Sequence, residues 1–239
     1  MAMDQSDSSI LSRYNIIVVN STNKIATYSQ DRKFIRSSAI STHNGYYVEK
    51  PGGLAIDSAE NDQVYVVGSN LKRKELVLLK LKSDLTLIKQ VRLVNQESEI
   101  YGLEVLDEQL MICKANKSIS VHTKDLDHVQ ELSLSYIPRD IFSDRQGTLY
   151  VSTSSFIAVL KNDGTVLRSF GQDILSEAWG VHGAGGYIYV ANKRGVSVFT
   201  TEGKYVTSFM DNRTFSPRGL CLDKDGFVYI CDFGYISIY

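Results

Sequence analysis

Four large side chains with binding chemistry recur along the chain at a nearly constant spacing. They are Tyr101, Arg139, Trp179 and Arg218, which are separated by 38, 40 and 39 residues. Tyr, Trp and Arg are enriched at the energetic centres of binding interfaces, because each combines a large contact area with a polar group. If the fold brings these four positions together, they form a surface that recognises a partner.

The spacing belongs to a longer repeat that includes all three prolines of the chain. The prolines begin three similar segments: Pro51-Gly52-Gly53-Leu54, Pro138-Arg139-Asp140-Ile141 and Pro217-Arg218-Gly219-Leu220. The same register is marked at Gly53, Gly102, Asp140, Gly180 and Gly219. An apolar triplet follows each mark after about ten residues, in the order Val64-Tyr65-Val66, Leu110-Met111-Ile112, Leu149-Tyr150-Val151, Ile188-Tyr189-Val190 and Val228-Tyr229-Ile230. A repeat of about 40 residues with short β-rich segments is typical of one β-propeller blade.

Each repeat contains further segments with the two-residue alternation of a half-buried strand. Glycine-containing turns such as Asn162-Asp163-Gly164 and Glu202-Gly203 separate the third strand from the fourth. The stretch Gly183-Ala184-Gly185-Gly186 is interpreted as a hairpin rather than a phosphate loop, since no helix follows it.

We therefore predict an all-β, six-bladed β-propeller of four-stranded antiparallel blades, in which the first and last blades are incomplete. The first blade is expected to lack its innermost strand and the last its fourth, which suggests a fragment. Residues 8–11 are a candidate for one missing strand. The predicted organisation is a flexible tail over residues 1–12 and a single propeller over residues 13–239.

The bulk composition indicates a soluble domain in a reducing compartment. The formal net charge is −1 and 43% of the residues are apolar, so the chain is not a bulk polyanion binder. The start of the chain is acidic and polar, unlike a secretory signal, and no run is long enough for a membrane span. Cys113, Cys221 and Cys231 fall in predicted strands and are interpreted as buried free thiols, with a Cys221–Cys231 disulfide as the alternative. We expect a cytoplasmic protein.

The last repeat resembles an NHL repeat. Its segments Ser216–Asp223, Gly226–Asp232 and Ile236–Ile238 are similar to the family pattern of Pro-x-Gly-apolar-x-x-Asp followed by Gly-x-apolar-Tyr-apolar-x-Asp. The resemblance extends over residues 15–239. It implies a propeller such as those that read substrates in tripartite-motif ubiquitin ligases, several of which bind single-stranded RNA. With no zinc-binding RING or B-box in the sequence, this chain alone is not expected to transfer ubiquitin.

Residues for catalysis are not grouped in the sequence. His43, His122, His128 and His182 lack metal-ligand spacing, and the chain has no nucleophile elbow. Asp140 is the one carboxylate among the repeat marks, whereas calcium needs several converging oxygens. Asp140 is expected to cap backbone amides, with a part in a tunnel ligand set as the alternative. We expect no enzyme, metal or cofactor; a calcium-dependent ester hydrolase or lactonase is the enzymatic alternative.

Cations in the predicted loops between second and third strands would surround the four repeated side chains. The predicted partner site consists of Tyr101, Arg139, Trp179 and Arg218 with Lys24, Lys72, Arg73, Lys74, Lys114, Lys117, Lys193 and Arg194. We predict a non-catalytic module that binds a protein, a peptide or an acidic partner on this face, with neither membrane nor small-molecule cofactor as partner. Single-stranded RNA, stacked on Tyr101 and Trp179, is the alternative ligand. Simple packing of the four side chains and a mixed solvated surface also remain open.

Overall fold

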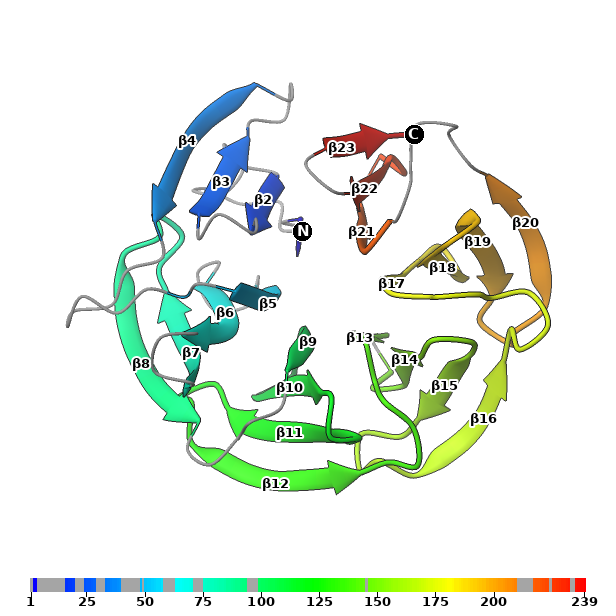
Figure 1. The fold of residues 1–239 in the computed structure, drawn as a ribbon, viewed down its shortest axis with the longest axis horizontal. Coiled ribbons are helices and arrows are strands. Elements are labelled where there is room, and N and C mark those ends of the chain that lie inside the picture. The colour runs from blue at the N-terminus through cyan, green and yellow to red at the C-terminus, as the bar shows by residue number, and fades with distance from the viewer. Residues whose placement is uncertain are drawn as a thin grey trace. The chain divides into compact units, whose positions relative to one another are not determined.

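All secondary structure that the computed structural model describes is β-strand (Figure 1). The described residues are 2–3, 16–19, 24–28, 33–39, 48, 50–57, 63–70, 75–93, 99–144, 146–209, 217–223, 225–232 and 235–239. The chain divides into two compact units. Unit 1 comprises Met1–Ile112 and Ser120–Gln130, and unit 2 comprises Cys113–Ile119 and Glu131–Tyr239.

Unit 1 contains two complete antiparallel sheets of four strands. The first is β1 (Ala2–Met3), β2 (Ile16–Val19), β3 (Lys24–Tyr28) and β4 (Phe34–Ala39). The second is β5 (Lys50–Asp57), β6 (Gln63–Asn70), β7 (Glu75–Leu81) and β8 (Leu87–Leu93). A third sheet has residues in both units and consists of β9 (Ile100–Leu106), β10 (Gln109–Lys114), β11 (Ser118–Thr123) and β12 (His128–Ser133).

The prediction that the first sheet lacks a strand is wrong. Ala2 and Met3 pair with Ile17 and Ile16 of β2, so part of the segment expected to be a tail completes the sheet. A strand of two residues has too little periodicity to be found in the sequence. Residues 8–11, the sequence candidate for this place, lie outside the described residues.

Unit 2 contains the remaining sheets, which follow the chain in order. They are β13 (Asp140–Ser143), β14 (Leu149–Ser152), β15 (Ile157–Leu160) and β16 (Val166–Phe170); then β17 (Val181–Ala184), β18 (Tyr187–Asn192), β19 (Gly195–Thr200) and β20 (Tyr205–Phe209); then β21 (Gly219–Leu222), β22 (Val228–Asp232) and β23 (Tyr235–Ile238). The described residues thus form five sheets of four strands, and β21–β23 has three, as expected for the last repeat.

The second strand of a sheet is buried because its two faces pack against different neighbours. Val64 and Val66 of β6 join the core that includes Ile25 and Val48, whereas Tyr65 joins the core on the other face. Alternate side chains of a strand point to opposite faces, so a strand buried on both sides is apolar at every position. This explains the recurring triplets of the sequence. Each fully buried aliphatic side chain contributes about 1.5–3 kcal/mol.

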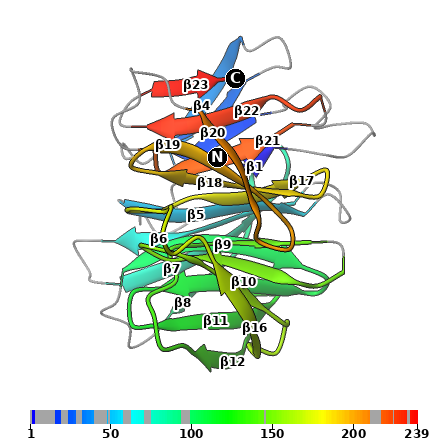
Figure 2. The ribbon, with the colours of Figure 1, turned by 90° about the vertical axis from the view of Figure 1, so that its right-hand side faces the viewer.

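The fourth strands are more exposed than the second strands, and tight turns connect them to the third strands. Val166 of β16 is 55% exposed and Val206 of β20 is 47% exposed; both strands lie on the side shown in Figure 2. The predicted turns are confirmed. Gly164 and Gly203 have positive φ, and their backbone N–H groups donate to the carbonyls of Lys161 and Thr200. The hairpin prediction for residues 183–186 is also confirmed: Gly185 and Gly186 link β17 to β18 with φ of 58° and 82°.

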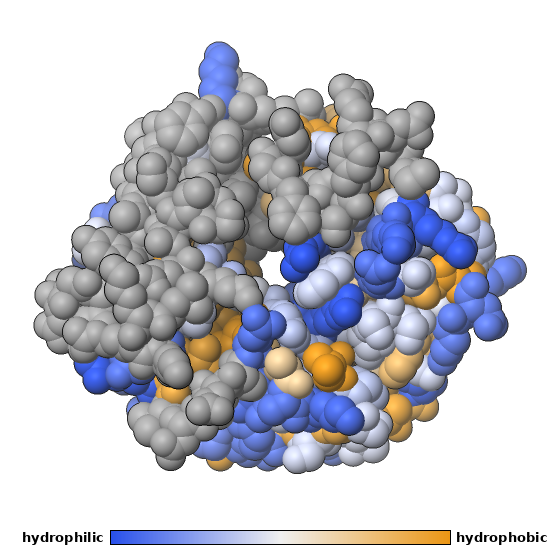
Figure 3. Space-filling view, in the orientation of Figure 1, coloured by the Kyte–Doolittle hydropathy of each residue, from blue (hydrophilic) through white to orange (hydrophobic). Residues whose placement is uncertain are grey.

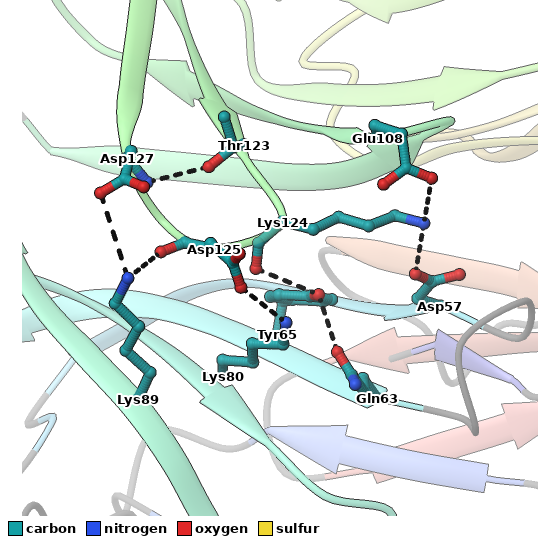
Figure 4. A network of polar contacts seen from close by, with 10 residues as sticks. All are labelled: Asp57, Gln63, Tyr65, Lys80, Lys89, Glu108, Thr123, Lys124, Asp125 and Asp127. Atoms are coloured by element: carbon teal, nitrogen blue, oxygen red, sulfur yellow. Dashed lines mark hydrogen bonds and ion pairs between the residues drawn. The ribbon is translucent and has the colours of Figure 1, made fainter.

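A network of polar contacts joins the loop of Lys124 to the sheet β5–β8 within unit 1 (Figure 4). The Lys124 ammonium lies 2.7 Å from a carboxylate oxygen of Asp57, and the two side chains are 8% and 5% exposed. Glu108, which is 81% exposed, lies 3.5 Å from the same ammonium. The buried Tyr65 hydroxyl donates to the Lys124 carbonyl at 3.4 Å, and Lys80 pairs with Asp125 at 3.3 Å. The buried pair therefore fixes this loop onto the neighbouring sheet.

The three cysteines are free thiols and form no disulfide, as predicted. Cys113 and Cys221 are buried, and Cys231 is partly buried. Burial raises the pKa of the Cys221 thiol, which keeps it protonated and unreactive. In the part of the chain that is described, the structure has no helix of the length and hydropathy that crossing a membrane requires.

Candidate partner-binding site

Three of the four repeated side chains occupy equivalent places in unit 2. Each lies one or two residues before the first strand of its sheet. Its backbone N–H donates to a backbone carbonyl near the end of the second strand. The bonds are Arg139 to the Ser152 carbonyl at 2.8 Å, Trp179 to the Ala191 carbonyl at 2.8 Å and Arg218 to the Cys231 carbonyl at 2.9 Å. The sequence repeat therefore corresponds to a repeated backbone geometry, in which the three Cα atoms occupy equivalent positions in their sheets.

The three side chains meet because the first strands are neighbours. β17 packs beside both β13 and β21, as Figure 1 also shows. The Arg139 guanidinium carbon lies 4.0 Å from the centroid of the Trp179 ring, and that of Arg218 lies 4.3 Å from it. Both distances are within the range of a cation–π contact. We call Arg139, Trp179 and Arg218 the Arg–Trp–Arg stack.

Hydrogen bonds fix the backbone beneath the stack. Nη1 of Arg139 donates to the Ala178 carbonyl at 3.0 Å, and the Ser152 hydroxyl donates to the Trp179 carbonyl. Trp179 and Arg139 are half-buried, whereas Arg218 is exposed. Side chains that are held in place before binding lose less conformational entropy when a ligand arrives.

Gly180 allows β17 and β21 to approach closely enough for the stack. A Cβ at this position would lie 2.7 Å from the Arg218 carbonyl oxygen and 2.9 Å from the Leu220 nitrogen. Both of these are backbone atoms, so the neighbouring strand itself would have to move. The glycine of this repeat is thus required by the approach of two strands and not by a turn.

Charged side chains extend the site along one edge. Lys193 lies 2.6 Å from Glu177, and this ammonium, with a smaller contribution from Arg139, holds the pKa of the Glu177 carboxyl below its usual range. Lys193 and Arg194 are exposed in the turn between β18 and β19. Figure 3 shows hydrophilic side chains over the first strands of unit 2 on the face turned to the viewer.

Two titratable groups with shifted pKa values lie on first strands of unit 2, Asp140 on β13 and His182 on β17. Burial raises the pKa of Asp140 to about 6, although its Oδ2 accepts a hydrogen bond from the Val181 N–H at 3.0 Å. Asp140 therefore caps a backbone amide, as predicted. Burial lowers the pKa of His182 to about 4, and its ring packs against Phe142 with centroids 5.0 Å apart.

The lowered pKa of His182 predicts that its contribution to the stability of the fold is lost in acid. Its pKa in the fold lies below the ordinary value of 6.5, so the neutral ring stabilises the fold above pH 6.5 and this contribution is lost as the pH falls towards 4. Asp140 acts in the opposite sense, because its raised pKa gives a contribution that is present below 3.8 and lost as the pH rises through about 6. The contributions of these two groups should therefore largely offset each other between pH 4 and 6.5.

Replacing His182 should expose the balance between the two groups. We expect the free energy of unfolding of His182→Leu to improve relative to wild type by about 2–3 kcal/mol when the pH is lowered from 7 to 4.5. Denaturant titrations at both pH values measure this difference. Parallel pH profiles for the two proteins would show that His182 titrates normally in the fold.

The other predicted site residues that the structure describes are Lys114, Tyr101, Lys117 and Lys24. The prediction that Lys114 is a surface cation is wrong, since its side chain is 1% exposed and its ammonium pairs with Glu131. Tyr101 belongs to unit 1, where its hydroxyl donates to Glu99 at 3.0 Å. Lys117 is exposed in unit 2, and Lys24 begins β3 of unit 1. The predicted cations at 72–74 lie outside the described residues.

Sequence reasoning did not find the residues that support the stack. The Ser152 hydroxyl and the Ala178 carbonyl hold Trp179 and Arg139, but neither residue type stands out in a sequence. The pairing of Glu177 with Lys193 depends on the fold and not on a sequence motif. Among the described residues, no group of three or more His, Cys, Asp and Glu side chains could hold a metal ion.

Comparisons with known proteins identify the class of fold. No known family model matches the chain, and no curated protein sequence matches it either. Solved structures do match. A streptogramin B lyase structure is 18% identical with a TM-score of 0.67, covering 95% of this chain and 78% of the other. Virginiamycin B lyase from Staphylococcus aureus is 15% identical with a TM-score of 0.66, covering 93% and 82%. The WD40 β-propeller domain of Doa1 is 12% identical with a TM-score of 0.63, covering 96% and 89%.

These similarities and the sheet topology define the chain as an all-β propeller with four-stranded antiparallel blades. At such low identity they show the fold alone, because propellers carry enzymes and binding modules alike.

Proposed function

We propose that this chain is a non-catalytic recognition module that binds a protein or peptide through the Arg–Trp–Arg stack. The observation that carries the proposal is the gathering of two guanidinium groups on one partly exposed indole, at 4.0 and 4.3 Å. Arg and Trp are the residue types that contribute most to binding energy when they lie at the centre of an interface. Lys193 and Arg194 would form the polar rim around them.

The finer identity of the propeller is part of the same proposal. The NHL-like pattern of the last repeat supports a six-bladed NHL-type propeller, in which the three-stranded sheet β21–β23 is the last blade. In this proposal the module reads a partner for another protein, as NHL domains do for ubiquitin ligases. Its place of action would be the cytoplasm.

Selection from a displayed peptide library tests the proposed function. We expect wild type to enrich a family of related peptides, and Trp179→Ala and Arg218→Ala to bind them at least tenfold more weakly. The melting temperature should change little in Arg218→Ala, since this side chain is exposed. Arg168→Ala is the matched control, because Arg168 is an exposed arginine on β16, at the opposite end of its sheet from β13.

The outcomes separate binding from packing. Enriched peptides that bind Arg168→Ala normally but not the stack variants support the proposal. A loss of stability that parallels the loss of binding in every variant would assign the stack to packing. No enrichment by the wild-type protein would also contradict the proposal.

A further inference from the structure

We infer that the outer edge of β23, the edge that faces away from β22, binds an extended segment of a partner protein, which adds to the sheet as a fourth strand. In unit 2, β16 and β20 are the outermost strands of their sheets, whereas the last sheet ends at β23 (Figure 1). Among the described residues, β23 pairs only with β22. The corresponding strands β15 and β19 pair on both sides. This site is independent of the Arg–Trp–Arg stack.

The backbone of β23 directs hydrogen-bonding groups along this edge. The N–H groups of Val228 and Tyr239 each donate to the carbonyl of the other residue, at 2.9 and 3.0 Å. Successive residues of an antiparallel strand direct their backbone groups to opposite sides, so those of Ile236 and Ile238 point away from β22. These two residues therefore present two donors and two acceptors with the alternation that an added antiparallel strand requires.

The side chains of the same two residues are less covered than those at corresponding positions. The register places Ile236 where β19 has Val196 and β15 has Ile157. Val196 and Ile157 are fully buried, whereas Ile236 and Ile238 are only partly buried. An added strand would cover this apolar surface, and that burial favours its binding.

The fourth strands of the two preceding sheets indicate the chemistry of the ligand. Both β16 and β20 end in Ser-Phe. Phe170 of β16 pairs with Ile157, and Phe209 of β20 pairs with Val196. Each phenylalanine thus lies opposite the residue that corresponds to Ile236. We therefore expect a ligand of high strand propensity with an aromatic residue opposite Ile236.

Two further observations favour pairing with another protein at this edge. None of the four residues of β23 is charged, so the strand lacks the charged side chains that discourage pairing at exposed edges. The fourth strands of the described sheets are already paired in their own sheets. A second folded copy therefore has no such strand to offer, and the ligand is a segment of a different protein.

Amide hydrogen exchange followed by NMR tests the site residue by residue. In the free protein, the amides of Ile236 and Ile238 should exchange at least tenfold faster than that of Ser237, whose N–H points to β22. The probe is a capped peptide with the sequence of residues 204–209, which contains β20. A saturating amount of this peptide should slow exchange at Ile236 and Ile238 at least tenfold.

Methylated forms of the peptide separate strand addition from a general apolar contact. The residues copied from Thr207 and Phe209 would direct their N–H groups to β23, as the originals pair with β19. N-methylation at these two positions should weaken binding at least tenfold. N-methylation at the positions of Val206 and Ser208 is the matched control, because their N–H groups would face away from β23, and it should leave binding within about threefold.

Variants of the protein test the same edge by calorimetry. Ile238→Pro removes a donor that points away from β22, so it should weaken the peptide at least tenfold with little change in melting temperature. Ile238→Val keeps the donor and should bind as wild type does. Arg218→Ala should also bind this peptide normally, because Arg218 precedes β21 at the opposite end of the sheet.

Protected amides at Ile236 and Ile238 in the free protein would overturn the inference, because the edge would then be occupied within the chain. Failure of the peptide to bind would overturn it, as would equal binding of the two methylated forms or unchanged binding by folded Ile238→Pro. A dimer that Ile238→Pro abolishes would show that a second copy is the ligand. Loss of binding in Arg218→Ala would place the peptide at the stack, whereas failure of library capture alone would contradict only the proposed function.

Discussion

Asp57→Ala is expected to lower the free energy of unfolding by about 3–5 kcal/mol. Asp57 and Lys124 are 5% and 8% exposed and lie 2.7 Å apart, so removal of the carboxylate leaves a buried ammonium with a weakened set of partners. Glu108 offers only partial compensation, at 3.5 Å and from an exposed position. Denaturant titration of the purified variant measures the effect.

A double-mutant cycle distinguishes the pair from its surroundings. Lys124→Met and the double variant complete the cycle. The double variant should recover part of the stability lost in Asp57→Ala, because the ammonium that lost its nearest carboxylate is no longer present. Glu108→Ala serves as the control and should change the stability by less than about 1 kcal/mol, since Glu108 is 81% exposed. If Asp57→Ala lowers the free energy of unfolding no more than Glu108→Ala does, the contribution of the buried pair does not exceed that of a surface contact.

Gly180→Ala is expected to lower stability by about 1–3 kcal/mol and also to weaken peptide binding. The added Cβ would lie 2.7 Å from the Arg218 carbonyl oxygen, so β21 must shift and carry Arg218 away from the Trp179 ring. Thermal melting and calorimetry on the same preparation measure both effects.

Gly147→Ala provides a matched control for this prediction. Its Cβ would meet no atom within 4 Å, but its φ of 79° makes alanine unfavourable, so stability should fall without a change in binding. Equal loss of binding in both variants would show that destabilisation alone, and not the position of Arg218, weakens the site.

The repeated strands were predictable because they follow local rules. Apolar triplets such as Val64-Tyr65-Val66 are apolar at every position, since both faces of the second strand are covered. Gly164 and Gly203 stand where a turn requires positive φ. The two-residue strand Ala2–Met3 was missed, because pairing with β2 and not its own pattern makes it a strand.

The candidate site was predictable in part. The period of the repeat placed Arg139, Trp179 and Arg218 at equivalent positions, and the structure brings these three together. The period gives only the position of a backbone, however, and not the direction of a side chain. Lys114 shares the pattern of the loop cations, yet its ammonium is buried against Glu131. Contacts such as Ser152 to the Trp179 carbonyl depend on how two sheets pack, which no local pattern encodes.

The emission of Trp179 tests the central claim most directly, because the chain contains a single tryptophan. Titration with a peptide selected by the wild-type protein, under excitation selective for tryptophan, should give a saturable change in emission. Its midpoint should equal the dissociation constant from calorimetry. A peptide that binds by calorimetry and leaves the tryptophan emission unchanged would show that the ligand binds elsewhere and that the Arg–Trp–Arg stack is not the recognition site.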